Sequence, residues 1–217
     1  AGYKFARPYA PTTFVNCDFC EGYKIDARAK VTFINCRVNG VDLTPANYTT
    51  LVTSNQSNAE FTTEDGNPIV ADASSLNKAL ANGNEVVLAA DIAVKSTETG
   101  SNGYGAAGIS QLNGGTIDGN GNNISVNAWG TWDSAINTTG GTIRNLNVTG
   151  GMRGIFVNHN STNNSKVILE NVTIDGTVYT ISCDQGTNQG LEAYNSTFNG
   201  WTSYAATIGA VKFDGCS

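Results

Sequence analysis

Charged residues are scarce in this sequence, and it has no long apolar or basic segment. Asp, Glu, Lys and Arg make up only 14% of the 217 residues, against about 25% in a typical soluble protein. The 12 basic residues are scattered among 18 acidic ones, which argues against nucleic acid as a partner. No apolar run approaches the ~20 residues that a membrane-spanning helix needs, and the first residues lack the pattern of a signal peptide.

Cysteine and histidine are also few, which limits the metal and disulfide sites that the sequence can predict. The five cysteines are an odd number, which argues against a complete disulfide framework. A cysteine metal site typically requires two closely spaced cysteine pairs, whereas only Cys17 and Cys20 are close in the sequence. The single histidine, His159, lies in a polar segment and is interpreted as a solvated loop residue. We therefore expect no cofactor and no metal ion.

What the sequence does contain is a repeated phrase of alternating apolar and polar residues around an Asn or Gly. Copies cover residues 12–19, 31–38, 141–148, 167–174, 191–198 and 211–216. Alternation with a period of two predicts strands. In the copy 31–38 it predicts four inward-facing side chains, Val31, Phe33, Cys36 and Val38. Spacings of 19 to 26 residues between successive Asn positions indicate a solenoid.

Two parts of the phrase carry a family resemblance: the Asn corners (Asn16, Asn35, Asn145, Asn171 and Asn195) and the turn at 117–121. On these residues the chain resembles right-handed parallel β-helix proteins of the pectate-lyase-like type. The resemblance implies an all-β right-handed parallel β-helix of about eight coils. Equivalent side chains would stack ~4.8 Å apart. The corner asparagines would form a buried, hydrogen-bonded ladder, and Cys17, Cys36 and Cys216 would stack beside it as small apolar residues.

The order of the caps is unusual for such a fold. A short amphipathic helix usually covers the N-terminal end, and here its signals begin at Asp72 and Ser74, with Gly83 as a stop. A second short helix, which would close the C-terminal end, is predicted from Thr44 and Pro45. The C-terminal cap therefore precedes the N-terminal cap in the sequence.

Three explanations of this order remain open. In a circular permutation, residues 1–52 are the last coils with their closing cap, 53–71 are a linker, and 72–217 are the cap helix and first coils of one domain. Joining residue 217 to residue 1 gives a Cys216-to-Cys17 spacing of 18, close to the 19 between Cys17 and Cys36. Alternatively, the two parts belong to tandem β-helices, or residues 1–52 complete a neighbouring chain.

Aromatic and charged residues between the phrases are candidates for a ligand-binding face. Flat rings beside polar groups suit sugar binding, although aromatic residues can also simply cover the core edges. The candidate ligand residues are Trp129, Trp132, Asp133, Arg153, Tyr179, Trp201, Tyr204, Arg7, Tyr9 and Arg28.

Catalytic signals are weak by comparison. Enzymes of the resembled type use clustered carboxylates, and glycoside hydrolysis needs two carboxyl groups beside the bond. Glu64 and Asp65 are the only adjacent acidic pair, and they lie in the predicted linker. Asp118 is part of a turn signal. No catalytic residue is assigned. The sequence leaves enzyme activity undecided but favours a protein without it.

These observations predict a non-catalytic, rearranged β-helix from a secreted or cell-surface glycan-binding or adhesin-like module, a location that rests on fold analogy. One alternative is a polysaccharide lyase or glycoside hydrolase. The other is a structural scaffold that assembles through its coil ends or by segment exchange. The expected partner is a polysaccharide or glycan, and a permuted chain would be a monomer.

Overall fold

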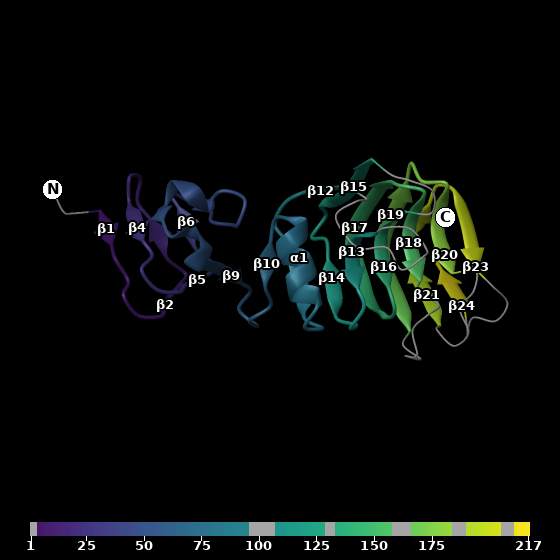
Figure 1. The fold of residues 1–217 in the computed structure, drawn as a ribbon, viewed down its shortest axis with the longest axis horizontal. Helices are drawn as coiled ribbons and strands as arrows, with labels where there is room; N and C mark the ends of the chain where they lie inside the picture. The colour runs from purple at the N-terminus through teal and green to yellow at the C-terminus, as the bar shows by residue number, and fades with distance from the viewer. Residues whose placement is uncertain (1–3, 96–106, 129–132, 158–165, 184–189, 205–210) are drawn as a thin grey trace. The chain divides into compact units, whose positions relative to one another are not determined.

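A computed structural model describes the chain at residues 4–95, 107–128, 133–157, 166–183, 190–204 and 211–217 (Figure 1). The chain forms two compact units, unit 1 at Ala1–Val70 and unit 2 at Ala71–Ser217, and each is described by itself. Both consist mainly of short strands, and nearly all described strand pairs are parallel. The predicted all-β class is confirmed.

The described part of unit 1, residues 4–70, contains ten short strands and two 3-10 helices. They are β1 (Phe5–Ala6), β2 (Thr12–Val15), β3 (Asp18–Phe19), β4 (Lys24–Asp26), β5 (Val31–Ile34), β6 (Arg37–Val38), β7 (Val41–Asp42), η1 (Tyr48–Thr50), β8 (Val52–Ser54), η2 (Gln56–Asn58), β9 (Ala59–Thr62) and β10 (Ile69–Val70). Three small sheets have the orders β1-β4-β8, β2-β5-β9 and β3-β6-β7. Successive repeats therefore add parallel strands to the first two sheets, whereas in the third sheet β7 folds back on β6 as an antiparallel partner.

The core of unit 1 contains a stack of aromatic rings from the sheet β2-β5-β9. Phe14 pairs with Phe33, and Phe33 with Phe61, along β2, β5 and β9. The ring centroids lie 5.5 and 5.3 Å apart in stacked orientation. Val31, Phe33 and Cys36 are buried, as the alternation predicted, and Val38 is half-buried. The period of two therefore identified the inward face of β5 correctly.

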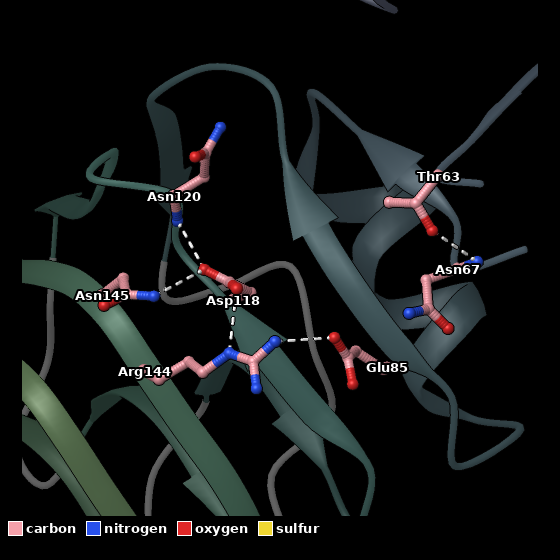
Figure 2. Close-up of polar contacts among 7 residues, drawn as sticks. All are labelled: Thr63, Asn67, Glu85, Asp118, Asn120, Arg144 and Asn145. Atoms are coloured by element: carbon pink, nitrogen blue, oxygen red, sulfur yellow. Dashed lines mark hydrogen bonds and ion pairs between the residues drawn. The ribbon is translucent and has the colours of Figure 1, made fainter. Parts of the chain in front are cut away.

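Two segments of unit 1 differ from the expected local structure. The closing helix predicted from Thr44 is wrong: the segment is a turn followed by the three-residue η1. The Asn47 side chain accepts from the Thr44 N–H and donates to the Asp42 carbonyl, so local side-chain bonds hold the backbone in a turn instead of a helix. The predicted linker 53–71 contains β9, which continues the aromatic stack, and a turn in which Thr63 Oγ1 accepts from the Asn67 N–H (Figure 2).

Unit 2 begins with a helix and continues with strands. The elements are α1 (Ala73–Leu80), β11 (Glu85–Leu88), β12 (Ile92–Lys95), β13 (Ala107–Gln111), β14 (Thr116–Asp118), β15 (Asn123–Ala128), β16 (Ser134–Thr138), β17 (Gly141–Gly150), β18 (Arg153–Val157), β19 (Val167–Asp175), β20 (Tyr179–Cys183), β21 (Leu191–Tyr194), β22 (Thr197–Phe198), β23 (Trp201–Tyr204) and β24 (Val211–Asp214). One parallel sheet runs β11-β14-β17-β19-β21-β24, and another runs β13-β16-β18-β20-β23. Figure 1 shows these strands side by side in succession.

Equivalent residues of neighbouring strands form continuous rows in both sheets of unit 2. In the second sheet, Ile109, Ile136, Ile155 and Ile181 follow one another in register, and all four are fully buried. Burying one isoleucine side chain is worth about 1.5–3 kcal/mol relative to leaving it exposed. These rows of aliphatic side chains hold successive repeats together where unit 1 uses aromatic rings.

The cap helix α1 starts where the sequence indicated. Asp72 is its N-cap, and its side chain accepts from the Ser75 N–H at 2.9 Å. Ser74, the other N-cap candidate, lies within the helix. Leu76 and Leu80 are fully buried, and Gly83 takes the left-handed conformation shortly after the helix ends. The helix therefore packs its apolar stripe into the core of unit 2.

The predicted asparagine ladder exists, but it is not buried. All five corner asparagines have a left-handed backbone, with φ between 48° and 55°. Asn35 Nδ2 donates to Asn16 Oδ1 at 2.7 Å, and Asn171 Nδ2 to Asn145 Oδ1 at 3.1 Å. Asn145 is half-buried and the others are exposed. Asn tolerates this conformation, and at Asn35 and Asn171 its amide also donates to the corner asparagine of the preceding repeat.

Candidate functional site

Three of the predicted ligand residues meet in one row of the second sheet of unit 2. Arg153 on β18 is opposite Tyr179 on β20, and Tyr179 is opposite Trp201 on β23. The rings of Tyr179 and Trp201 are 6.1 Å apart in an edge-to-face arrangement. Trp201 is 72% exposed and Tyr179 is half-buried. Strand pairing thus places an exposed indole beside a phenol on adjacent strands.

Arg153 and Asp133 lie inside the protein rather than on this surface. Arg153 is only 4% exposed and Asp133 only 8%. The guanidinium of Arg153 lies over the Phe156 ring, 4.5 Å from its centroid, and the Arg153 N–H donates to the Asp133 carbonyl at 3.0 Å. A buried cation held on an aromatic face is stabilised mainly by its protein surroundings. The side chains of these two residues are therefore buried beside the row and are not available to a ligand in solvent.

The other candidates of unit 2 add little to this geometry. Tyr204 is the last residue of β23 and pairs with Cys183 on β20. Trp129 and Trp132 lie outside the described residues. The structure thus brings the rings of Tyr179 and Trp201 together on adjacent strands, and we call these two residues the aromatic pair.

Unit 1 holds the remaining candidates around one buried carboxylate. Arg7 Nε lies 2.8 Å and Arg28 Nη2 2.9 Å from Asp26 Oδ2. Asp26 is buried, whereas both arginine side chains are about half exposed. The exposed Tyr9 hydrogen-bonds Arg7, and together with the Asp26 carboxylate it raises the pKa of Arg7 despite partial desolvation. Two guanidinium groups share one carboxylate, which leaves one positive charge that an anionic ligand can meet.

A further polar cluster of unit 2 was not predicted as a site (Figure 2). Arg144 on β17 lies between Asp118 on β14 and Glu85 on β11, with N–O distances of 2.8 and 2.7 Å. Asp118 also accepts from the Asn120 N–H and from Asn145 Nδ2. Partners that lie 26 and 59 residues from Arg144 in the sequence cannot be paired from spacing. Only the strand register brings them together.

The electrostatics of this cluster favour a structural role. Burial by itself would raise the pKa of Asp118, but hydrogen bonds from Arg144, the Asn120 N–H and Asn145 outweigh it, so the pKa lies below the usual value. The hydrogen bond with Asp118 in turn raises the pKa of Arg144. A general acid needs a raised pKa and an arginine base a lowered one. Neither Asp118 nor Arg144 is therefore tuned for proton transfer.

The charged residues continue along the same sheet towards its last strand. Lys166 pairs with Glu192, Tyr194 donates to Glu192 at 2.8 Å, and Lys212 lies over the Tyr194 ring and pairs with Asp214. Within the described part of the chain, no group of three or more His, Cys, Asp or Glu residues could hold a metal ion. The contacts of Lys166 with Glu192 and of Lys212 with the Tyr194 ring join neighbouring repeats, whereas the other two lie within one strand.

Comparisons with protein-family models, with curated proteins and with solved structures found no match to this chain. Among the described residues, no helix is long and apolar enough to cross a membrane.

Proposed function

We propose that this chain is a non-catalytic right-handed parallel β-helix module that binds polysaccharide at the aromatic pair. Three features support the β-helix: the resemblance of the Asn corners, the left-handed backbone at those corners, and the repeated addition of one strand to each parallel sheet. Such a module suits a secreted or cell-surface protein. The position of the cap helix α1 in the middle of the sequence fits a circular permutation, tandem domains or segment exchange.

The observation that carries the binding proposal is the exposed indole of Trp201. A tryptophan that is 72% exposed places a large apolar ring in water, next to the half-buried Tyr179. Sugar rings offer apolar C–H faces that pack on such a ring, while their hydroxyl groups bond nearby polar atoms. The edge-to-face geometry of the pair provides one stacking face and one adjacent wall rather than a flat platform.

The charges of the chain suggest which polysaccharides it selects. Arg7 and Arg28 in unit 1 share a single carboxylate and carry a net positive charge, which suits a uronate or sulfate group. The cluster in unit 1 is thus a second point at which an acidic polymer can bind. Neutral glycans would engage the aromatic pair alone, so acidic polymers should bind more tightly.

The proposal is tested by glycan binding with a graded series at Trp201. Binding to an array of acidic and neutral polysaccharides should fall about tenfold or more for Trp201→Ala, the cost of losing one stacked ring. Trp201→Phe should retain most of it because a stacking face remains. Val178→Ala, which shortens another exposed apolar residue, is the matched control. Absence of binding to every polymer, or equal binding by Trp201→Ala, would contradict the proposal.

The same samples separate a binding module from an enzyme. A lyase or hydrolase would shorten the polymers that it binds, and the product size would fall with time. Because Asp118 and Arg144 neutralise each other, we expect the polymer length to stay unchanged. Depolymerisation would favour the enzyme alternative instead.

A further inference from the structure

The last strand of unit 2 has an open edge with apolar side chains. Among the described residues, β24 pairs only with β21. Phe213 ends a row whose other five members are fully buried, yet Phe213 itself is 40% exposed; these members are Val86, Ile117, Ile143, Leu169 and Ala193. A hollow of about 350 Å³ lies here, lined by Phe198, Thr202, Phe213, Cys216 and Ser217. We call this region the unit 2 edge.

The first strands of unit 1 have an open edge on the side where a preceding repeat would pair, whereas β24 is open on the side where a following repeat would pair. In the described residues β2 pairs only with β5, and β3 only with β6. Phe14 begins the aromatic stack of unit 1, and Val15 is 49% exposed. A second hollow, of about 330 Å³, is lined by Asn16, Cys17, Asp18, Asn35 and Arg37. We call this region the unit 1 edge.

We propose that the unit 2 edge of one molecule binds the unit 1 edge of a second copy, so that strands 211–217 and 12–18 pair in parallel and in register. The two edges have Phe and Cys at the same spacing, since Cys216 follows Phe213 by three residues and Cys17 follows Phe14 by three residues. Placing Phe213 opposite Phe14 also places Cys216 opposite Cys17.

The backbone groups at the two edges are complementary in this register. The N–H of Asn16 donates to the Ile34 carbonyl on β5. Because backbone N–H and C=O groups point to opposite sides at successive residues of a strand, those of Thr13 and Val15 point to the open side. Likewise the N–H of Asn195 donates to the Asp214 carbonyl. By the same pattern the N–H of Gly215 would donate to the Val15 carbonyl of the second copy.

The thiol hydrogen bonds of three equivalent cysteines also differ at the unit 1 edge. Cys36 Sγ donates to the Phe14 carbonyl one repeat back, and Cys216 Sγ donates to the Ala193 carbonyl one repeat back. Cys17 Sγ donates within its own repeat, to Val15. With a second copy in place, the Phe213 carbonyl would occupy the position that Phe14 has for Cys36. Docking therefore supplies Cys17 with the partner that its two equivalents already have.

Complementarity at both ends identifies a second copy as the occupant. A strand edge recruits another strand of matching pattern, and the edge at β2 matches the edge at β24 residue for residue at Phe14 and Cys17. The facing side chains are also compatible in charge, since Lys212 and Asp214 already pair with each other and would face the uncharged Thr13 and Val15. Because the two edges differ, each docked copy leaves another open edge, and the assembly grows head to tail.

Self-association with a blocked edge is the first test. Sedimentation velocity of the 217-residue chain should show oligomers that grow with concentration. Thr13→Pro removes an outward N–H without touching the bonds to β5 and should weaken association by at least about tenfold. Thr13→Val keeps that N–H and should associate as the parent does, while circular dichroism checks that both variants stay folded. A parent that is monomeric at every concentration, or equal association by both variants, overturns the proposal.

Disulfide mapping identifies the partner. Neighbouring strands put Cys17 and Cys216 of two copies ~4.8 Å apart, which is within the Cα separation that a disulfide bridges. Diamide, a two-electron oxidant, takes the two thiol hydrogens as the S–S bond forms. Burial raises the pKa of Cys36, so Cys36 should react more slowly with Cys17.

We expect covalent dimers and longer ladders that contain the Cys17–Cys216 peptide. The ladders should be lost in Cys17→Ser and Cys216→Ser and kept in Cys20→Ser. The same peptide in a monomer would show that the two edges close within one chain. Ladders without this peptide would show that another surface mediates assembly. Either result would overturn the proposal.

Discussion

The two units stack their repeats in the same way but fill them differently. Unit 1 uses the aromatic stack Phe14, Phe33 and Phe61, whereas unit 2 uses rows of isoleucine such as Ile136 and Ile155. Unit 1 has three short sheets, and unit 2 has two long ones with a capping helix. The comparison teaches that the repeat needs only a period of two and a left-handed corner, while the identity of the apolar residue is free to change.

Removing the central ring should unfold unit 1 while leaving unit 2 intact. Phe33 touches rings on both sides, so Phe33→Ala should cost about 3–5 kcal/mol, as large aromatic truncations do. The larger core of unit 2 should keep its own transition. Thermal unfolding followed by calorimetry should then show one early and one unchanged transition. The matched variant in unit 2, Ile143→Ala, should shift only the later transition, and a common shift in both variants would mean that the units unfold as one.

Breaking the ion pair of Figure 2 should affect unit 2 alone. Asp118→Asn removes the carboxylate that accepts from Arg144 and Asn145, and it should destabilise unit 2 by about 1–3 kcal/mol. Glu85→Gln removes the more exposed partner and should cost less than about 1 kcal/mol. Chemical denaturation measures both. Equal effects of the two variants would contradict the central role given to Asp118.

Changing one corner separates backbone conformation from the amide ladder. Asn35→Ala places a residue with a Cβ in the left-handed region, at a cost of about 1–2 kcal/mol. Asn35→Gly relieves that strain and loses only the exposed hydrogen bond to Asn16. The glycine variant should therefore be the more stable of the two by denaturant midpoint. If alanine were the better substitution, the corner would not depend on its left-handed backbone.

The stability of unit 2 should depend on acidity through Asp118. Its pKa is lower in the folded protein than in the unfolded chain, so the ionised form is favoured by folding. This contribution is complete above the unfolded pKa, about 3.9, and it is lost as the pH falls through the lower folded value. The free energy of unfolding should thus fall below about pH 4 less steeply in Asp118→Asn than in the parent. Parallel pH profiles would show that other carboxyl groups dominate.

Local pattern predicted some features of the molecule well and others poorly. Alternation placed Val31, Phe33 and Cys36 inside because strand geometry enforces a period of two. The corner asparagines were located correctly, but their burial was wrong, since a left-handed corner turns this side chain outward to the next repeat. The closing helix at Thr44 was wrong because Asn47 bonds the local backbone, which a cap signal does not reveal.

The candidate sites depended more on pairing across the sheet than on sequence position. Tyr179 and Trp201 were both named, but only the register of β20 and β23 makes them neighbours. Arg153 was named as a ligand residue and lies buried, because an alternating pattern does not say which charged residue is covered by others. The Arg144 cluster escaped prediction because its partners come from three different repeats.

In the proposed assembly, the open edges of the two units are halves of one strand ladder. Amide hydrogen exchange, measured on the whole chain at increasing protein concentration, tests it most directly. Head-to-tail docking predicts that protection rises at Thr13, Val15 and Gly215, whose N–H groups point to the open side, while Phe14, already bonded to β5, changes little. Exchange at these three amides that stays the same across the concentration range in which the protein associates would contradict the account.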